Sequence, residues 1–280
     1  MTETITKITR RDLFAGALGA HLAQGLVKKG RLKQSVSRWP YQKIPLPEFC
    51  RACAEMGLPA IDLLEEADWA VAREHGLVCS MGYAGGGSIK DGLNVVANHD
   101  GIVRNFERTI PRAAAMRVPN VITFFGNRQG MGDEQATANC IVGLNRVKRI
   151  AENEGVTICV ELLNSKVNHP DYQGDRTPFG AAIVKAVGSP RVKLLYDIYH
   201  MQIMEGDVIH TIRDNHDLIA HYHTGGVPGR HELDDTQELN WAAICRAIVD
   251  TGFRGYLAHE FVPTRDPLTS LREAVALCDV

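Results

Sequence analysis

The segments that decide the fold are Thr157-Ile-Cys-Val-Glu161, Lys193-Leu-Leu-Tyr-Asp197, Ala220-His-Tyr-His223 and Tyr256-Leu-Ala-His-Glu260. Each is a short apolar run that ends on a glutamate, an aspartate or a histidine, the residue types that bind metal ions. Burying a carboxylate at the end of a strand costs free energy unless a hydrogen-bond donor or a positive charge lies beside it. Four such residues at the carboxyl ends of four strands therefore predict a cation that all four bind.

The spacing of the four terminal residues indicates how the segments are arranged. Successive positions lie 36, 26 and 37 residues apart, about one strand and one helix each. Such units place consecutive strands side by side in a parallel sheet, with their carboxyl ends at one edge. We expect the four side chains to meet there.

The rest of the chain repeats the strand and helix alternation without a break. Helical apolar spacing recurs over Asp133–Asn153 and Trp241–Asp250. Eight strands that alternate with helices favour a closed (β/α)8 TIM barrel over an open sheet, and residues 31–280 are predicted to form it as a single domain. The predicted strands are Leu32–Ser37, Ala60–Leu64, Leu77–Met81, Asn120–Phe125, Val156–Leu162, Val192–Tyr196, Ala220–His223 and Gly255–Glu260.

The loops after the predicted strands carry further polar side chains, as expected for the catalytic face of a barrel. Gly85-Gly-Gly87 resembles a phosphate loop, but it lacks both the Lys-Ser/Thr pair and the GxGxxG order, so we interpret it as a flexible rim loop. The polar loop segments are Arg38-Trp39, Gly82–Ser88, Asn127-Arg128, Asn164–Lys166, His200 and Arg230–Glu232.

Composition narrows the class of protein. The chain has 280 residues, of which 45% are hydrophobic and 23% charged, enough for a sizeable core. A formal net charge of −2 disfavours a nucleic-acid partner. No uninterrupted apolar window is long enough to span a membrane. Seven scattered cysteines do not resemble a disulfide framework and are predicted to be small core residues, Cys50 and Cys53 included. A homo-oligomer is compatible with the sequence.

The N-terminal segment, residues 1–30, predicts export. Thr9-Arg10-Arg11-Asp12-Leu13-Phe14, followed by the weakly apolar Ala15–Ala20, resembles a twin-arginine signal and so favours a periplasmic protein. No clean cleavage site follows it. The alternative is an ordinary amphipathic helix at the start of a cytoplasmic protein.

Four ordered motifs resemble those of hydroxypyruvate isomerases in the xylose isomerase-like TIM barrel superfamily. They are Val160–Asn164, Tyr196–His200, His223 with Val227–Glu232, and Ala258–Phe261. The resemblance implies that Glu161, Asp197, His223 and Glu260 bind one divalent ion and that Glu161 and Glu260 are also the acid and base. It further implies that His200 touches the substrate and places His231 beside the substrate-binding Arg230.

Two departures leave the substrate open. His223 stands where hydroxypyruvate isomerases tend to have glutamine and ketose 3-epimerases have histidine, whereas Val227–Glu232 favours the first group. Ketose 3-epimerases also resemble one another in a Glu-x5-Glu pattern after the fifth strand. In this chain Glu161 is the first residue of that pattern, and Val167 stands where the second glutamate would be. A 3-epimerase is therefore an alternative.

The expected chemistry is the transfer of a proton alpha to a carbonyl through an enediolate whose oxygens are held by a cation. Mixed carboxylate and imidazole ligands suit magnesium, manganese, cobalt or zinc. Arg230 and Lys166 are candidates for anchoring the far end of a keto acid or a sugar. A keto-sugar dehydratase and a non-catalytic sugar-binding barrel are further alternatives, and an abasic-site endonuclease is disfavoured by the charge.

Overall fold

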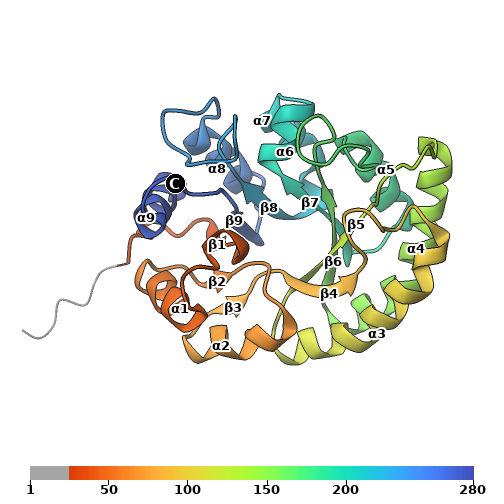
Figure 1. Ribbon diagram of the computed structural model, residues 1–280, viewed down its shortest axis with the longest axis horizontal. Coiled ribbons are helices and arrows are strands. Elements are labelled where there is room, and N and C mark those ends of the chain that lie inside the picture. Colours follow the sequence, from red (N-terminus) through yellow and green to blue (C-terminus); the bar gives the residue numbers. More distant parts are fainter. Residues whose placement is uncertain (1–24) are drawn as a thin grey trace, which may run out of the picture.

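The computed structural model describes residues 25–280, and these form a parallel β-barrel surrounded by helices (Figure 1). The predicted twin-arginine motif lies outside the described residues. The strands are β1 (Lys33–Val36), β2 (Ala60–Ile61), β3 (Val78–Cys79), β4 (Gly82–Gly86), β5 (Asn120–Phe124), β6 (Thr157–Leu162), β7 (Val192–Asp197), β8 (Ile219–Thr224) and β9 (Tyr256–His259).

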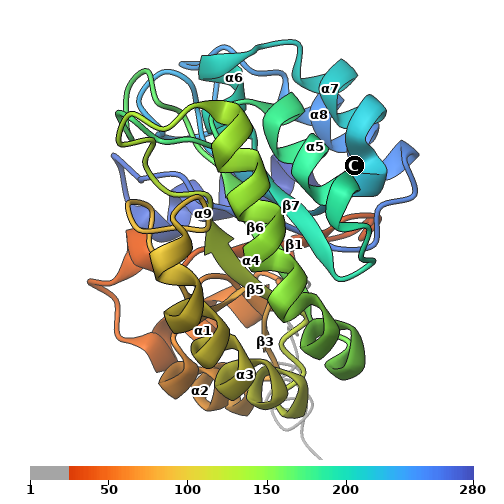
Figure 2. The same cartoon turned by 90° about the vertical axis from the view of Figure 1, so that its right-hand side faces the viewer.

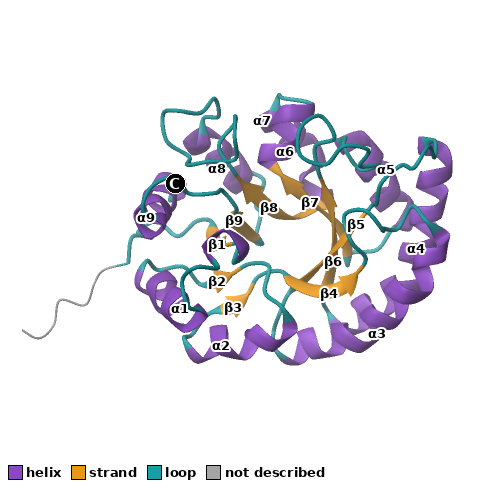
Figure 3. Cartoon of the chain, viewed as in Figure 1, coloured by secondary structure: helices purple, strands orange, loops and turns teal. Residues whose placement is uncertain are grey.

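Helices follow most of the strands and lie outside the ring, as the colours of Figure 3 show. Figure 2 shows α4 running along the outside of the barrel. The helices are α1 (Leu46–Glu55), α2 (Trp69–Glu74), α3 (His99–Ala115), α4 (Asp133–Glu154), α5 (Thr177–Val187), α6 (Ile198–Met204), α7 (Val208–Asn215), α8 (Trp241–Asp250) and α9 (Pro267–Cys278).

Helix ends match local sequence signals. Asn240 accepts a hydrogen bond from the backbone N–H of Ala243 at the start of α8, and Asp266 does the same for Thr269 at the start of α9. Helix α4 ends at Glu154 and is capped by Gly155, whose φ of 71° is the left-handed conformation that glycine adopts without strain.

The strands form a curled seven-stranded parallel sheet and a two-stranded parallel sheet, which together close a ring. Seven strands pair in the order β1-β9-β8-β7-β6-β5-β4, and β2 pairs with β3. The ring closes through bridges between Ser37 and Asp62 and between Leu64 and Gly82. Since β3 and β4 follow each other in the chain, they serve together as the third barrel strand. The predicted eight-strand barrel is confirmed.

One predicted loop is a strand. Gly82–Gly86, interpreted from sequence as part of a flexible rim loop, is β4 and pairs with β5. Its glycines permit close packing: a Cβ on Gly86 would lie 2.5 Å from Cζ of Phe106 and 2.8 Å from the carbonyl oxygen of Ile122. The run of glycines therefore fits a strand against a helix, which the sequence signal alone did not distinguish from a loop.

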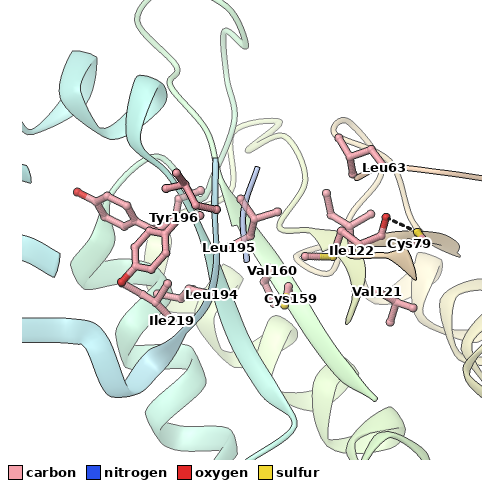
Figure 4. Close-up of a cluster of buried hydrophobic side chains, with 14 of the residues drawn as sticks. Leu63, Cys79, Val121, Ile122, Cys159, Val160, Leu194, Leu195, Tyr196 and Ile219 are labelled. Carbon is pink, nitrogen blue, oxygen red and sulfur yellow. Dashed lines mark hydrogen bonds between the residues drawn. The ribbon is translucent and has the colours of Figure 1, made fainter. Parts of the chain in front are cut away.

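The core occupies the space between the strands and the helices, part of which Figure 4 shows. Strands β5 and β6 are buried along their whole length, as expected for parallel strands covered by helices. All seven cysteines are free and buried, so the prediction that they are core residues is confirmed. No helix among the described residues is long and apolar enough to cross a membrane.

Candidate active site

The four predicted ligands meet at the carboxyl ends of four adjacent strands. Glu161 lies in β6, Asp197 ends β7, His223 lies in β8, and Glu260 directly follows β9. One donor atom from each lies within 4.8 Å of the others, and all four residues are buried. The spacing argument from sequence therefore predicted a cluster that the fold assembles.

The imidazole of His223 lies at the centre of the three carboxylates. Its Nδ1 is 2.5 Å from Oε2 of Glu260, 3.4 Å from Oε1 of Glu161 and 3.9 Å from Oδ2 of Asp197. Its other nitrogen, Nε2, faces away from the cluster toward Asp62, 2.9 Å from Oδ2. Nδ1 is therefore the nitrogen that is available to a shared cation.

Arg230 supplies a positive charge at the edge of the cluster. Its guanidinium donates hydrogen bonds to Oδ2 of Asp197 at 3.0 Å and to Oε2 of Glu260 at 2.6 Å. The guanidinium also lies over the rings of Trp39 and Tyr199, 5.5 and 5.2 Å from their centroids. These contacts fix the guanidinium beside the pocket, in agreement with a substrate-contacting role.

The cluster fits a divalent cation. Once ionised, the three carboxylates outnumber the single guanidinium beside them, so a divalent cation would balance their charge in this buried site. Nδ1 of His223 is buried and makes no well-aligned hydrogen bond, so a cation bound among the carboxylates would give this nitrogen a partner. Carboxylate and imidazole together suit magnesium, manganese, cobalt or zinc.

The two glutamates have opposite pKa shifts. Burial, together with repulsion from Glu260 and Asp197, raises the pKa of Glu161 to about 7. Burial acts in the same direction on Glu260, but the attraction of Arg230 and His223 outweighs it and lowers the pKa of Glu260 to about 2. Near neutral pH one carboxyl therefore holds a proton while its neighbour is ionised.

His200 lies beside the cluster as a neutral donor. Its Nδ1 accepts a hydrogen bond from the backbone N–H of Asn164 at 3.1 Å, so the proton is on Nε2. Nε2 is 3.6 Å from Oδ2 of Asp197 and has no hydrogen-bond partner among the described residues. Burial and the charge of Arg230 hold the pKa of His200 well below its usual range.

Two predicted substrate contacts lie elsewhere. The amine of Lys166 donates to the carbonyl oxygens of Ile203 and Met204 at 2.9 and 3.4 Å, at the carboxyl end of α6. His231 is exposed, and its Nδ1 lies 3.0 Å from the carbonyl oxygen of Val262. Neither residue lines the pocket. The structure places both side chains against backbone carbonyls outside this pocket, and their predicted contact with the substrate stays a prediction.

A pocket of about 290 Å³ opens over the cluster, and it contains residues that sequence reasoning missed. Trp39 donates from Nε1 to Oε1 of Glu260 at 2.6 Å. His169 also lines the pocket. The lining residues are Trp39, Leu63, Tyr83, Ile89, Ile122, Phe124, Glu161, Leu163, His169, Arg230 and Glu260.

Comparison with known proteins gives the family. A family model described as xylose isomerase-like TIM barrel matches residues 33–279. The chain belongs to this family. The crystal structure of a family 2 AP endonuclease from Brucella melitensis has the same fold, with a TM-score of 0.78 at 22% sequence identity over 86% of this chain and 97% of that chain.

Three relatives carry names that bear on activity. Hydroxypyruvate isomerase of Escherichia coli is 25% identical over 75% of this chain and 74% of its own length. A 2-oxo-tetronate isomerase of Cupriavidus necator is 36% identical over 40% of this chain and 43% of its own. D-psicose 3-epimerase of Agrobacterium fabrum is 33% identical over 45% of this chain and 43% of its own. These names agree with the predicted isomerase class.

Proposed function

We propose that this protein is a metal-dependent isomerase or epimerase of a small hydroxy-carbonyl compound, a keto acid or a sugar. The observation that carries the proposal is the pair Glu161 and Glu260. Both line one pocket, both contact the same imidazole, and their pKa values are shifted apart. Two carboxyl groups that face one substrate and differ in proton affinity can serve as the acid and base that proton transfer between carbons requires.

Glu161, Asp197, Glu260 and Nδ1 of His223 would hold the ion. A divalent cation bound there supplies positive charge that stabilises the oxygens of an enediolate. In one direction of the reaction, the Glu260 carboxylate would take the proton from the carbon alpha to the carbonyl, and the Glu161 carboxylate would take the hydroxyl proton and return it to the neighbouring carbon. Glu260 would then give its proton to the former carbonyl oxygen, so that both glutamates end as carboxylates. In the reverse direction the two exchange roles.

The surrounding residues orient the substrate. Arg230 and His200 present N–H donors beside Asp197, where hydroxyl or carboxylate oxygens would be recognised. The rings of Trp39 and Tyr83 and the side chains of Ile122 and Phe124 also line the pocket and give it an apolar surface. A volume of about 290 Å³ suits a substrate of a few carbon atoms.

Within this proposal the isomerase is the first candidate and a 3-epimerase the second, which the match to D-psicose 3-epimerase and the imidazole at His223 favour. The two activities share deprotonation alpha to a carbonyl and differ in the atom to which the proton returns.

The test is product identification by proton NMR after incubation of metal-loaded protein with hydroxypyruvate, 2-oxo-tetronate and a panel of ketoses. An aldehyde or ketone isomer supports the isomerase, and an inverted carbon centre supports the epimerase. Loss of water from the product would replace the proposal by a dehydratase. Binding without conversion of any compound would indicate a non-catalytic sugar-binding barrel.

A further inference from the structure

A layer of polar side chains lies inside the barrel directly below the carboxylate cluster. Ser35, Asp62, Ser80 and His221 are buried there, with exposed fractions of zero. Barrel interiors are normally filled by branched apolar side chains. Burying a carboxylate in this position costs free energy unless it is fully hydrogen-bonded, so the layer calls for a functional explanation.

Asp62 is the centre of this layer. It lies at the closing seam of the barrel, where its backbone N–H donates to the carbonyl oxygen of Val36 at 2.7 Å. Its carboxylate accepts a hydrogen bond from Oγ of Ser80 at 2.6 Å, and its two oxygens lie 3.0 Å from Nε2 of His221 and 2.9 Å from Nε2 of His223. The backbone thus fixes the carboxylate across the barrel from β8.

We propose that Asp62 is a positioning residue for His223: it holds the proton of the imidazole on Nε2, so that in the ion-bound protein the Nδ1 lone pair is directed at the ion. This inference rests on the proposed metal centre. A carboxylate only accepts hydrogen bonds, so the 2.9 Å contact requires a proton on Nε2. Nδ1 is the nitrogen that faces Glu161, Asp197 and Glu260.

The contact between Asp62 and His223 affects the ring in other ways besides placing its proton on Nε2. A carboxylate that accepts the distal N–H of a metal-binding imidazole holds the ring plane and raises the basicity of the other nitrogen. Since Asp62 and His223 are both fully buried, water does not replace the contact when it is lost. Removing the charge of Asp62 should therefore weaken the metal site although Asp62 does not itself bind the ion.

The first part of the test concerns the wild-type protein. Titration with zinc gives the number of bound ions, and proton–nitrogen NMR of 15N-histidine protein gives the state of both His223 nitrogens in the zinc-loaded form. We expect one ion per chain, with a proton on Nε2 and zinc on Nδ1. A second ion that removes the Nε2 proton, or a proton on Nδ1, would overturn the inference.

The second part compares Asp62→Asn with Asp175→Asn. Asp175 is a matched control because it is also a buried carboxylate, bound by Arg128 at 2.9 Å and Ser165 at 2.5 Å, and it touches none of the four ligands. We expect the zinc affinity to fall about 10–100-fold in Asp62→Asn and to stay within about twofold in the control.

The outcomes separate the two proposals. If the wild-type protein binds no divalent ion, the proposed metal centre fails. If it binds one ion and Asp62→Asn binds it equally well, the metal centre stands and the role of Asp62 is refuted. Should Asp62→Asn not fold, as judged by thermal unfolding, the tautomer of His223 in the wild-type protein decides the inference alone.

Discussion

Glu161 and Glu260 differ from the other carboxylates of the rim because both face the pocket and share the imidazole of His223. We predict that Glu161→Gln and Glu260→Gln each lower kcat by at least about 10²–10⁴-fold, the contribution typical of a general acid or base. Glu238→Gln, an exposed residue on a rim loop, is the control and should retain activity. Circular dichroism checks the fold. Full turnover in either pocket variant would exclude that residue as acid or base.

Metal affinity should depend on pH because three of the ligands have raised pKa values in the metal-free protein: Glu161, Asp197 and His223, whose pKa the surrounding carboxylates raise more than burial lowers it. Burial raises the pKa of Glu161 to about 7 and that of Asp197 to about 6. An ion must displace these protons, so its affinity should fall as the pH decreases below about 7. Calorimetric titration with manganese at pH 5.5 and at pH 8 measures the effect. Equal affinity at both values would show that neither carboxyl is protonated before the ion binds.

The four ligands could be predicted from sequence because each follows a recognisable apolar run, and the strand spacing then brings them together. Asp62 was missed although it follows Ala60-Ile61 in the same manner. The predicted strand ran on to Leu64, which placed Asp62 within the strand, whereas β2 ends at Ile61. Its contact with His223 joins residues 161 positions apart, and no local pattern encodes such a contact.

At the scale of elements, the close packing of β4 leads to a prediction about the stability of glycine variants. A Cβ on Gly86 would collide with Phe106 of α3 and with the backbone of Ile122 in β5, whereas a Cβ on Gly101 of α3 would meet nothing within 4 Å. We expect Gly86→Ala to lower the free energy of unfolding by about 1–3 kcal/mol. Gly101→Ala should raise it by up to about 1 kcal/mol, since alanine is the better helix former. Urea unfolding measures both, and a neutral Gly86→Ala would contradict the close packing of β4.

Most elements could be predicted because the strands of a parallel barrel are continuous apolar runs and the helices have periodic apolar faces. The exceptions are elements whose partners are distant in sequence. Gly82–Gly86 contains three glycines, and only its pairing with β5 and its contact with α3 make it a strand. The amine of Lys166 likewise turns to the end of α6, which loop position alone could not reveal.

At the scale of the whole molecule, stability should respond to metal and pH together. Glu161 has a folded-state pKa of about 7 against an ordinary value of 4.5, so its protonated form stabilises the metal-free fold below about pH 4.5. That contribution is lost as the pH rises toward 7 and above. The metal-free wild-type protein should therefore lose Tm between pH 5 and pH 8 relative to Glu161→Gln. Equal pH dependence of the two proteins would show that Glu161 is not the responsible group.

An ion bound to the four ligands should reverse this loss at pH 8. Ligand at about 100 times its Kd stabilises by about 2.7 kcal/mol, which corresponds to a rise in Tm of about 5–10 °C for a domain of this size. Differential scanning fluorimetry with manganese, and then with excess EDTA, measures the rise and its reversal. The same addition to His223→Ala is the control and should have little effect.

The most direct measurement of the central claim is solvent deuterium exchange followed by proton NMR in heavy water. Metal-loaded and EDTA-stripped protein are each incubated with the compound that gives turnover, or with hydroxypyruvate and the ketose panel. The proposed mechanism predicts deuterium at the carbon alpha to the carbonyl only in the metal-loaded sample, and none with Glu161→Gln or Glu260→Gln. Conversion of substrate without deuterium uptake, or equal uptake after removal of the metal, would contradict proton transfer by two glutamates at a metal centre.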